Sequence, residues 1–392
     1  MKTRTGVMLS AMMFMEYFIW SAWYVTMGTY MISRLQATGI HVGAAYSALA
    51  VATMVSPLFV GLVADRFFPA QKIMGWLHLL GAVLLIAATK VTANQTFYWI
   101  VLAYSLLYMP TIALSNNIAF YQMDDAGKQF PWIRVFGTVG WILAGLLVGY
   151  LNFAKTANSF YLAAGVSVAL GLFSFFLPNT PPKGSAAQGG NMMKDAGVLF
   201  RSKAYLIFFI AAVLVCIPLA FYYSFANSFL DEIGMTNAAG KMILGQVSEG
   251  LFILAIPFLF NRIGVKKMLL IGMGAWVLRY ICFAYGYGQP ESWLLYSGII
   301  LHGVCYDFFF VTGYMYTEKK AGEGIKNGAQ GLFTFATYGL GMFVGTWFAG
   351  FTVDRYQVGG AHLWKSVWMV PAGIAFLVLL YFVFFFSEKK QA

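Results

Sequence analysis

Long apolar stretches follow one another through almost the whole of this sequence, and they restrict the possible fold more than any other feature. A helix that crosses a bilayer needs about 20 mostly apolar residues, and the sequence holds about twelve such stretches separated by short loops. Only 10% of its residues are charged, against about a quarter in an average soluble domain. We therefore predict an all-α membrane protein with twelve transmembrane helices. The predicted spans are residues 7–32, 40–64, 72–92, 96–121, 131–152, 158–177, 203–229, 238–260, 267–288, 292–316, 327–350 and 363–386.

The basic residues separate by side of the membrane and do not form a patch. With the N-terminus placed in the cytoplasm, 17 of the 25 Lys and Arg residues fall on the cytoplasmic side, 6 fall outside and 2 lie within spans. This asymmetry follows the positive-inside rule and places both termini in the cytoplasm of a bacterial inner-membrane protein. The net charge of +11 therefore reflects membrane topology, and no nucleic-acid partner is expected. The first stretch contains Glu16 and lacks a small-residue cleavage site, so it is predicted to be an uncleaved span.

One long stretch that is not apolar divides the chain in two. Residues 178–202 carry Pro-Pro, Gly-Ser and Gly-Gly pairs, a composition typical of a flexible linker. The predicted domains are therefore a six-helix bundle at 1–177, a cytoplasmic linker at 178–202 and a second six-helix bundle at 203–392. Parallel six-span repeats are typical of transporters that bind their solute near the bilayer midplane between the two halves.

The loop after the second predicted span resembles that of the major facilitator superfamily. It carries a Gly-x-x-x-Asp-Arg pattern from Gly61 to Asp65 and Arg66. We expect a gating pair in which Asp65 lies near the positive N-terminus of another helix, the predicted eleventh span, while Arg66 pairs across the interface. The alternative is an ordinary charged loop.

Ionisable residues inside the predicted spans are the strongest functional signal, because each costs about 3 kcal/mol at mid-bilayer. Five are found: Glu16, Arg134, Glu249, Arg279 and Asp307. We expect them to face a hydrated polar site or one another. The alternative for Arg134, and more so for Arg279, is that the side chain extends to the lipid headgroups.

Polar and aromatic residues lie near these charges at helical spacing. Arg134, Thr138 and Trp141 share one helix face, Gln246 lies three residues before Glu249, and His302 lies four before Tyr306, next to Asp307. His302 alternatively packs as a neutral residue bonded to a neighbouring helix. Aromatic rings together with carboxylate, amide and hydroxyl groups suit a flat, polar ligand such as a nucleoside. Further candidates are Trp20, Trp23, Asn116, Asn117, Tyr222, Tyr223 and Asn227.

Several segments together resemble the bacterial nucleoside:proton symporter family over nearly the whole length. They are Tyr108-Met-Pro-Thr-Ile-Ala-Leu114, Ile133-Arg-Val-Phe-Gly-Thr-Val-Gly-Trp141, Phe221-Tyr-Tyr223 through Asn227, Gln246-Val-Ser-Glu249 and His302-Gly-Val-Cys-Tyr-Asp-Phe308. The resemblance implies a major facilitator fold with two pseudo-symmetric bundles. It also implies a substrate site lined by Arg134, Thr138, Gln246, Glu249 and Asp307. The sequence departs from the better-known permeases at Glu16, Ala220, Tyr223, His302 and Tyr306, so the range of nucleosides stays open.

The expected activity is import of nucleosides by proton symport through alternating access. Asp307 is the first candidate for the proton carrier, Glu249 the second and Glu16 the third, while Trp141, Tyr223 and Tyr306 stack on or bound the base. Neither a cofactor nor a metal is expected, and the protein is expected to act as a monomer in the lipid bilayer.

Other classes of protein were weighed against this expectation. A proton-coupled sugar or oligosaccharide permease, or another facilitator, could use the same amide and carboxylate groups. An intramembrane enzyme is disfavoured, since the sequence shows no paired metal ligands at helical spacing, no nucleophile with a paired His and no Gly-rich phosphate loop. A receptor is disfavoured because no signalling domain is attached to either end.

Overall fold

The computed structural model describes residues 3–59, 68–182, 196–322 and 325–387. Nearly all of these residues are helical, as the sequence predicts. The chain forms two compact units, one of Met1–Ala37 with Ala44–Gly189, and one of Thr38–Gly43 with Gly190–Ala392.

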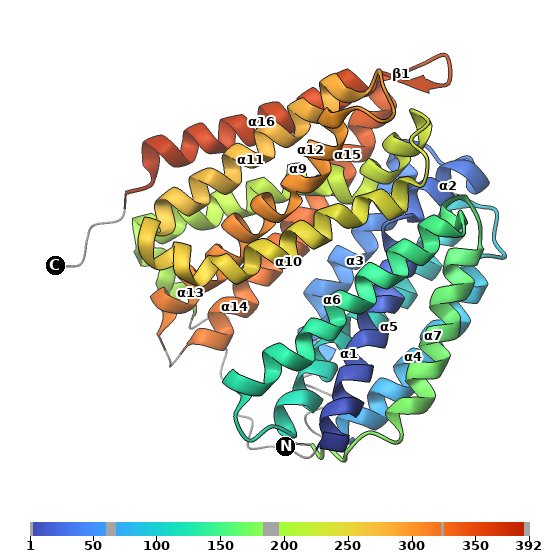
Figure 1. The fold of residues 1–392 in the computed structure, drawn as a ribbon, viewed down its shortest axis with the longest axis vertical. Coiled ribbons are helices and arrows are strands. Elements are labelled where there is room, and N and C mark those ends of the chain that lie inside the picture. Colours follow the sequence, from blue (N-terminus) through green and yellow to red (C-terminus); the bar gives the residue numbers. More distant parts are fainter. Residues whose placement is uncertain (1–2, 60–67, 183–195, 323–324, 388–392) are drawn as a thin grey trace. The chain divides into compact units, whose positions relative to one another are not determined.

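The first unit is a bundle in which α1 packs against α6 and α7, while α4 packs against α5 and α7 (Figure 1). This arrangement brings residues from the first, third, fourth and sixth predicted spans to the middle of one bundle. Its elements are α1 Thr3–Tyr24, α2 Met27–Leu35, α3 Gly39–Phe59 apart from its first turn, α4 Ala70–Ala88, α5 Asn94–Tyr121, α6 Ala126–Tyr150, η2 Phe153–Lys155 and α7 Asn158–Ser174.

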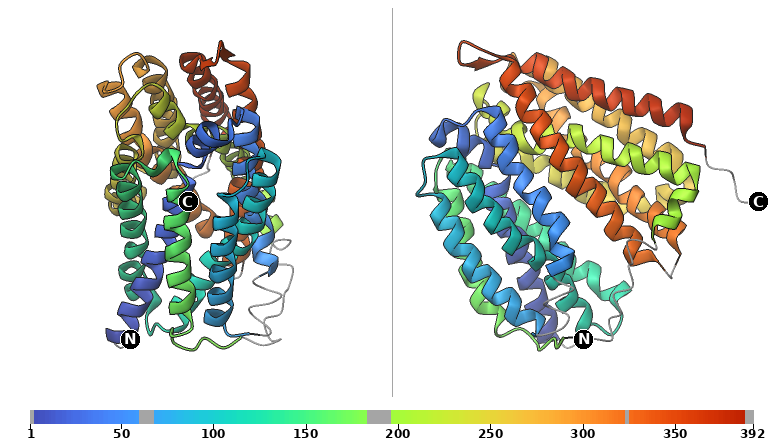
Figure 2. Two further views of the ribbon diagram at one scale, coloured as in Figure 1. Left: turned by 90° about the vertical axis from the view of Figure 1, so that its right-hand side faces the viewer. Right: turned by 180° about the vertical axis from the view of Figure 1, so that it is seen from behind.

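The second unit is a bundle in which α11 lies beside α12 and α16, while α9 lies beside α15 and α16 (Figure 2). Two of its long helices contain π-helical turns, η4 and η5. Its elements are η3 Gly197–Arg201, α9 Lys203–Glu232, α10 Ala238–Ile263, α11 Val265–Gly286, α12 Trp293–Tyr306, η4 Asp307–Val311, α13 Thr312–Ala321, α14 Lys326–Thr334, η5 Phe335–Gly341, α15 Met342–Arg355, β1 Gln357–Val358, β2 Ala361–His362 and α16 Trp364–Phe385.

Ten segments of the described chain are long and apolar enough to cross a membrane. The predicted sixth span corresponds to α7, which is apolar but only 17 residues long. The predicted first span corresponds to α1 and α2, and α1 is not among the ten. Each predicted span thus overlaps one or more described helices, while the count of twelve is not fully confirmed.

The prediction of one continuous helix over 7–32 is wrong, because the chain breaks between Tyr24 and Met27. A break inside a membrane frees backbone groups that must find partners. The Tyr46 hydroxyl from α3 supplies them: it donates to the Tyr24 carbonyl at 2.6 Å and accepts from the Gly28 N–H at 3.3 Å. The tyrosine therefore stabilises a break that no proline or glycine at that point indicates.

Two short features lie at the ends of the helices. A hairpin of β1 and β2 pairs Val358 with Ala361, and its turn residues Gly359 and Gly360 have φ of 60° and 85°, values that glycine adopts without strain. At the start of the predicted linker, the Thr180 N–H donates to Gln71 Oε1 at 2.9 Å. The linker's first residues are thus held against α4, and much of the rest lies outside the described residues, so its predicted boundaries stay a prediction.

Glycines allow helices to approach closely within each bundle. A Cβ at Gly303 of α12 would lie 2.5 Å from the backbone nitrogen of Glu249 in α10, and a Cβ at Gly140 of α6 would lie 2.2 Å from the Phe14 carbonyl oxygen in α1. Close backbone approach through small residues is a typical basis of helix association in membranes. These two contacts fix the helices that carry the predicted site residues.

Replacement of Gly303 by Ala should therefore destabilise the protein by roughly 1–3 kcal/mol, the usual range for overpacking. The two nearest opposing atoms at this position, Glu249 N and Ser248 C, belong to the backbone and cannot rotate away. Thermal unfolding in detergent would measure the effect. The matched control is Gly274→Ala in α11, where a Cβ meets nothing within 4 Å. Equal melting temperatures for the two variants would contradict the close contact.

Candidate functional site

Asp307 occupies a special backbone position in the second unit. It is the first residue of the π-helical turn η4, which joins α12 to α13. Such turns insert one residue into a helix and are frequent at functional sites. The Asp307 side chain is fully buried, and neither of its carboxyl oxygens has a hydrogen-bond partner among the described residues. A buried carboxyl group without partners is costly unless it binds a proton or a ligand.

Glu249 of α10 is the acidic group that interacts electrostatically with Asp307. Its side chain is 27% exposed, and its Oε2 lies 3.5 Å from Nε2 of the fully buried His302. The two acids therefore lie in one bundle, while the predicted shared polar site stays a prediction. The close approach of α10 and α12, which brings Glu249 near His302, depends on the Gly303 contact.

Arg279 of α11 completes this group, and the prediction that it could extend to the lipid headgroups is wrong. The side chain is fully buried. Its guanidinium lies 3.4 Å from the centroid of the Tyr222 ring, and its Nη1 lies 3.0 Å from His302 Nδ1. Stacking on an aromatic face and donation to a ring nitrogen together hold a buried cation.

The contact between Arg279 and His302 determines where the imidazole carries its proton. A guanidinium only donates hydrogen bonds, so His302 Nδ1 must accept. The ring proton then lies on Nε2, the atom that faces Glu249. Arg279 thus places the ring proton on the side of His302 that faces Glu249, where Nε2 has no hydrogen-bond partner among the described residues.

Aromatic residues surround this group in the second unit. The Tyr222 ring stacks on the His302 ring with centroids 5.0 Å apart, and the Tyr223 ring meets it edge-on at 6.1 Å. The Tyr338 hydroxyl in η5 donates to the Tyr306 hydroxyl at 2.5 Å. Of the expected aromatic contacts, Tyr223 and Tyr306 therefore lie beside His302 in one cluster.

Two further predicted residues of the second unit, Gln246 and Asn227, lie on α10 and α9. Gln246 is half-buried on α10, and no contact places it in the cluster. Asn227 of α9 is buried, with its side-chain nitrogen 3.6 Å from the Met242 sulfur. Their predicted roles toward a solute stay predictions.

The first unit contributes the predicted residues of α6. Arg134 is half-buried and lies over the Tyr17 ring of α1 at 4.0 Å from its centroid. Trp141 meets Trp20 edge-on with centroids 5.6 Å apart, and its carbonyl accepts a hydrogen bond from Ser21 at 2.8 Å. Arg134 and Trp141 are thus held by α1, whereas Thr138 between them is half-buried with no described partner contact.

Glu16 of α1 is fully buried, and it is not an isolated acid. Its carboxylate is bonded by His78 Nε2 at 2.9 Å and by the Thr111 hydroxyl at 2.6 Å. Sequence analysis missed His78 and Thr111. The available signal was a histidine near the middle of an otherwise apolar predicted span, a position that the hydrophobic pattern alone does not explain.

The predicted gating residues Asp65 and Arg66 lie outside the described residues. A related arrangement occurs in the second unit, where Asp354 at the end of α15 accepts from the backbone N–H of Ile40 at 2.9 Å. Asp354 also accepts from the Gly39 N–H, and so caps the first turn of α3. A carboxylate at a helix N-terminus is stabilised by the unpaired N–H groups and the helix dipole.

No cluster of three or more His, Cys, Asp or Glu residues that could hold a metal occurs in the part of the chain that the structure describes. The buried ionisable groups instead form two sets. One set belongs to the first unit, with Glu16 and His78, and the other to the second unit, with Glu249, Arg279 and Asp307. Acids and bases within apolar helices are typical of the ion and solute pathways of transport proteins.

A helical membrane fold with such buried charges defines a secondary transporter of the major facilitator fold, and comparison with known proteins gives its family. The chain matches the nucleoside H+ symporter family over residues 1–391 and belongs to it. It is therefore a transporter and not an enzyme.

Individual relatives agree with this assignment. The chain is 42% identical to the putative nucleoside transporter YegT of Escherichia coli, with 99% of this chain and 95% of the relative aligned. It is 35% identical to the xanthosine permease of Escherichia coli, with 97% and 95% aligned. The crystal structure of the nucleoside transporter NupG is similar at a TM-score of 0.91 and 33% identity, covering 99% of this chain and 100% of that one.

Substitution of Arg279 by Met should change the tautomer of His302. The variant keeps an unbranched side chain against Tyr222 but removes the donor to Nδ1, so the Nδ1–H tautomer becomes populated. The ¹⁵N shifts of the imidazole nitrogens measure this ratio directly. The control is Lys365→Met, which removes a cation from the exposed face at the start of α16. An unchanged His302 spectrum in the Arg279 variant would contradict the assigned role.

Proposed function

We propose that this protein imports nucleosides together with protons across the bacterial inner membrane, by alternating access. The observation that carries the proposal is the Asp307 carboxyl group, which is fully buried and has no hydrogen-bond partner among the described residues. Membership of the nucleoside H+ symporter family supports the same activity, and so do relatives named as nucleoside and xanthosine permeases.

Asp307 is the first choice for the proton carrier. When it is ionised, its charge is buried beside the second acid Glu249, an arrangement that like-charge repulsion and desolvation both oppose. Binding one proton removes both costs. Glu249, oriented by His302, is the second choice, and Glu16 is the third.

The substrate contacts are proposed from residue chemistry. Glu249, His302, Gln246 and Asn227 offer hydrogen-bonding groups for ribose and base, and Arg134 and Thr138 do so from the first unit. Trp141, Tyr223 and Tyr306 offer ring faces for the base, since stacking on an aromatic ring contributes about 1–3 kcal/mol per base. Asp65 and Arg66 are proposed as gating residues.

The energy of one proton is sufficient for accumulation. A proton moving down 100 mV releases about 2.3 kcal/mol, and each tenfold accumulation of a neutral solute takes about 1.4 kcal/mol. One proton per nucleoside therefore supports roughly 40-fold accumulation on voltage alone. We further propose that the protein acts as a monomer with both termini in the cytoplasm, in accord with the distribution of Lys and Arg.

A proton-coupled sugar or oligosaccharide permease is the second candidate. Hydroxyl recognition needs the same amide and carboxylate groups, so the residues alone do not separate the two substrates. Uptake of labelled adenosine, uridine and xanthosine into proteoliposomes, with and without a proton gradient, tests the nucleoside proposal. Proton-driven uptake of labelled maltose or sucrose, with no uptake of labelled nucleosides, would favour the sugar permease.

Replacement of Asp307 by Asn should lower uphill uptake. The steady-state accumulation ratio should fall roughly 40-fold under 100 mV, because the amide cannot carry the proton. Exchange of external for internal nucleoside should continue, since exchange does not require proton release. Asp124→Asn, in the exposed loop before α6, is the matched control. Full accumulation by the Asp307 variant would remove this residue from the coupling role.

A further inference from the structure

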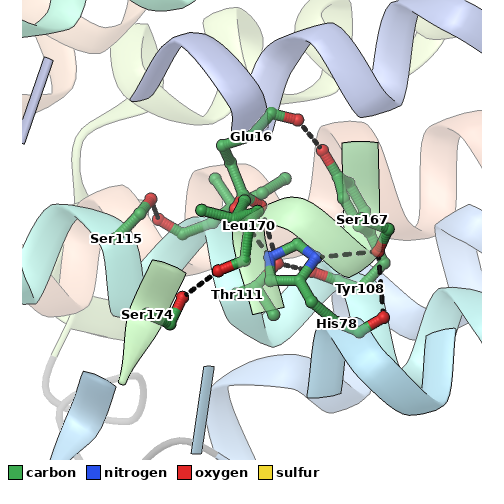
Figure 3. Close-up of polar contacts among 9 residues, drawn as sticks. Glu16, His78, Tyr108, Thr111, Ser115, Ser167, Leu170 and Ser174 are labelled. Carbon is green, nitrogen blue, oxygen red and sulfur yellow. Dashed lines mark hydrogen bonds and ion pairs between the residues drawn. The ribbon is translucent and has the colours of Figure 1, made fainter. Parts of the chain in front are cut away.

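Glu16 and His78 form a closed group of buried polar contacts in the first unit (Figure 3). The exposed fraction of Glu16 is 0% and that of His78 is 2%. On the far side of the imidazole, His78 Nδ1 lies 3.2 Å from the Ser167 hydroxyl of α7, and the same hydroxyl lies 3.0 Å from the His78 carbonyl oxygen. The acid therefore contacts one face of a histidine whose other face contacts a hydroxyl group with two possible acceptors.

When the Thr111 hydroxyl donates its hydrogen to Glu16 Oε1 and not to the Tyr108 carbonyl oxygen, the hydrogens in the remaining contacts give two consistent states. In the first, Ser167 donates its single hydrogen to the His78 carbonyl oxygen and accepts from Nδ1–H. His78 Nε2 and the Glu16 carboxyl group must then share a second proton, because two lone pairs 2.9 Å apart would otherwise repel. In this state the pair is neutral overall.

In the second state, Ser167 rotates its hydroxyl and donates to His78 Nδ1. The single imidazole proton then lies on Nε2 and is donated to the Glu16 carboxylate. This state holds one proton fewer and carries one negative charge. Rotation of one hydroxyl group thus lets the same heavy-atom geometry accept or lose one proton.

Among the described residues, the groups that face the pair do not supply a competing ion partner. Helix α5 contributes the Tyr104 and Tyr108 phenols and α1 contributes Tyr17, all of which interact electrostatically with Glu16. The Arg134 guanidinium of α6 lies over the Tyr17 ring. From α7 the pair meets the Ser167 hydroxyl.

The pair is also connected to residues with proposed substrate roles. The Tyr108 hydroxyl donates to the Glu16 carbonyl at 2.6 Å, and Tyr108 meets Trp20 edge-on one turn along α1. Trp20 in turn packs on Trp141 of α6. A change of charge at Glu16 therefore acts on the helix that holds Trp141 and Arg134.

We propose that Glu16, His78 and Ser167 form a second proton-binding site, which takes up and releases one proton in each transport cycle in addition to the proton carried by Asp307. The coupling part of this proposal rests on the proposed nucleoside symport, whereas proton binding by the pair does not.

Imidazole ¹⁵N spectra of histidine-labelled protein in nanodiscs test proton binding directly. The chain has four His residues, and the His78 signals are assigned by their loss in His78→Gln. Between pH 5 and pH 9 we expect His78 to change its protonation or tautomer state once. A His78 spectrum that does not change over this range would overturn the proposal.

The role of the Ser167 hydroxyl group can be tested against Ser174, a serine on the same helix. Ser167→Ala should shift the titration midpoint of His78 by up to about one pH unit, because each state loses a hydrogen bond of different strength. Ser174→Ala removes a hydroxyl that donates to Leu170 of its own helix at 2.7 Å and does not contact the pair (Figure 3). It should leave the midpoint unchanged. Equal midpoints in the two variants would contradict the role of Ser167.

Proton stoichiometry tests the coupling. In proteoliposomes with labelled adenosine, the voltage that halts net flux should change by about 30 mV per tenfold nucleoside gradient for two coupled protons and by about 59 mV for one. We expect about 30 mV, the change for two protons, for the wild type and for the control His41→Gln, whose side chain is exposed. We expect about 59 mV, the change for one proton, for Glu16→Gln and His78→Gln.

If the wild type gives the voltage change for one proton, or if both variants give the voltage change for two, the proposal that a second proton is coupled to transport is wrong. A wild type without any proton-driven uptake would overturn the symport itself. The His78 titration would then show whether the pair still binds a proton, so the two failures are distinguishable.

Discussion

The burial of ionisable groups among apolar helices is the constraint on which this structure depends. A charge at mid-bilayer costs about 3 kcal/mol on insertion scales. The chain carries several ionisable groups within its apolar helices. The helices accommodate them in two different ways. Glu16 and Arg279 receive partners from neighbouring helices, His78 and His302 respectively, whereas Asp307 receives none among the described residues. A partnered group keeps a defined position, and a group without partners gains most from binding a proton or a solute.

The backbone is adapted to these groups at particular points. Gly303 allows α12 to approach α10 so closely that His302 and Glu249 come within 3.5 Å of each other. Directly after His302 and Tyr306, the π-helical turn η4 begins at Asp307, and a second π-helical turn, η5, carries Tyr338 to the Tyr306 hydroxyl. Regular α-helices would place these side chains in a different rotation about the helix axis. The cluster therefore depends on irregular backbone as much as on the residues themselves.

The sequence was sufficient for the class of fold and drew attention to particular residues of the candidate site. Glu249 and Asp307 are conspicuous because an acid within a long apolar run has few structural explanations, and both do lie in one bundle. The partners were harder to predict, since His78 and Ser167 are separated by 89 residues and nothing in helical periodicity encodes which helices lie side by side. For Arg279 the sequence left two alternatives open, because the long side chain of an arginine within a span can also extend to the headgroups. Its burial becomes clear only when Tyr222 and His302 are seen on neighbouring helices.

The two histidines illustrate how a neighbouring residue determines the chemistry of one side chain type. At His302, a guanidinium that can only donate fixes the acceptor nitrogen, so the imidazole has one tautomer and acts as an orienting group for Glu249. At His78, a hydroxyl that can donate or accept occupies the equivalent place, so two protonation states fit the same heavy atoms. The difference between a positioning histidine and a proton-binding histidine thus lies in the group behind the ring, because both rings face a glutamate. The second unit thus holds a histidine with one tautomer beside Glu249, whereas the proposed site of the first unit lets Glu16 change its charge.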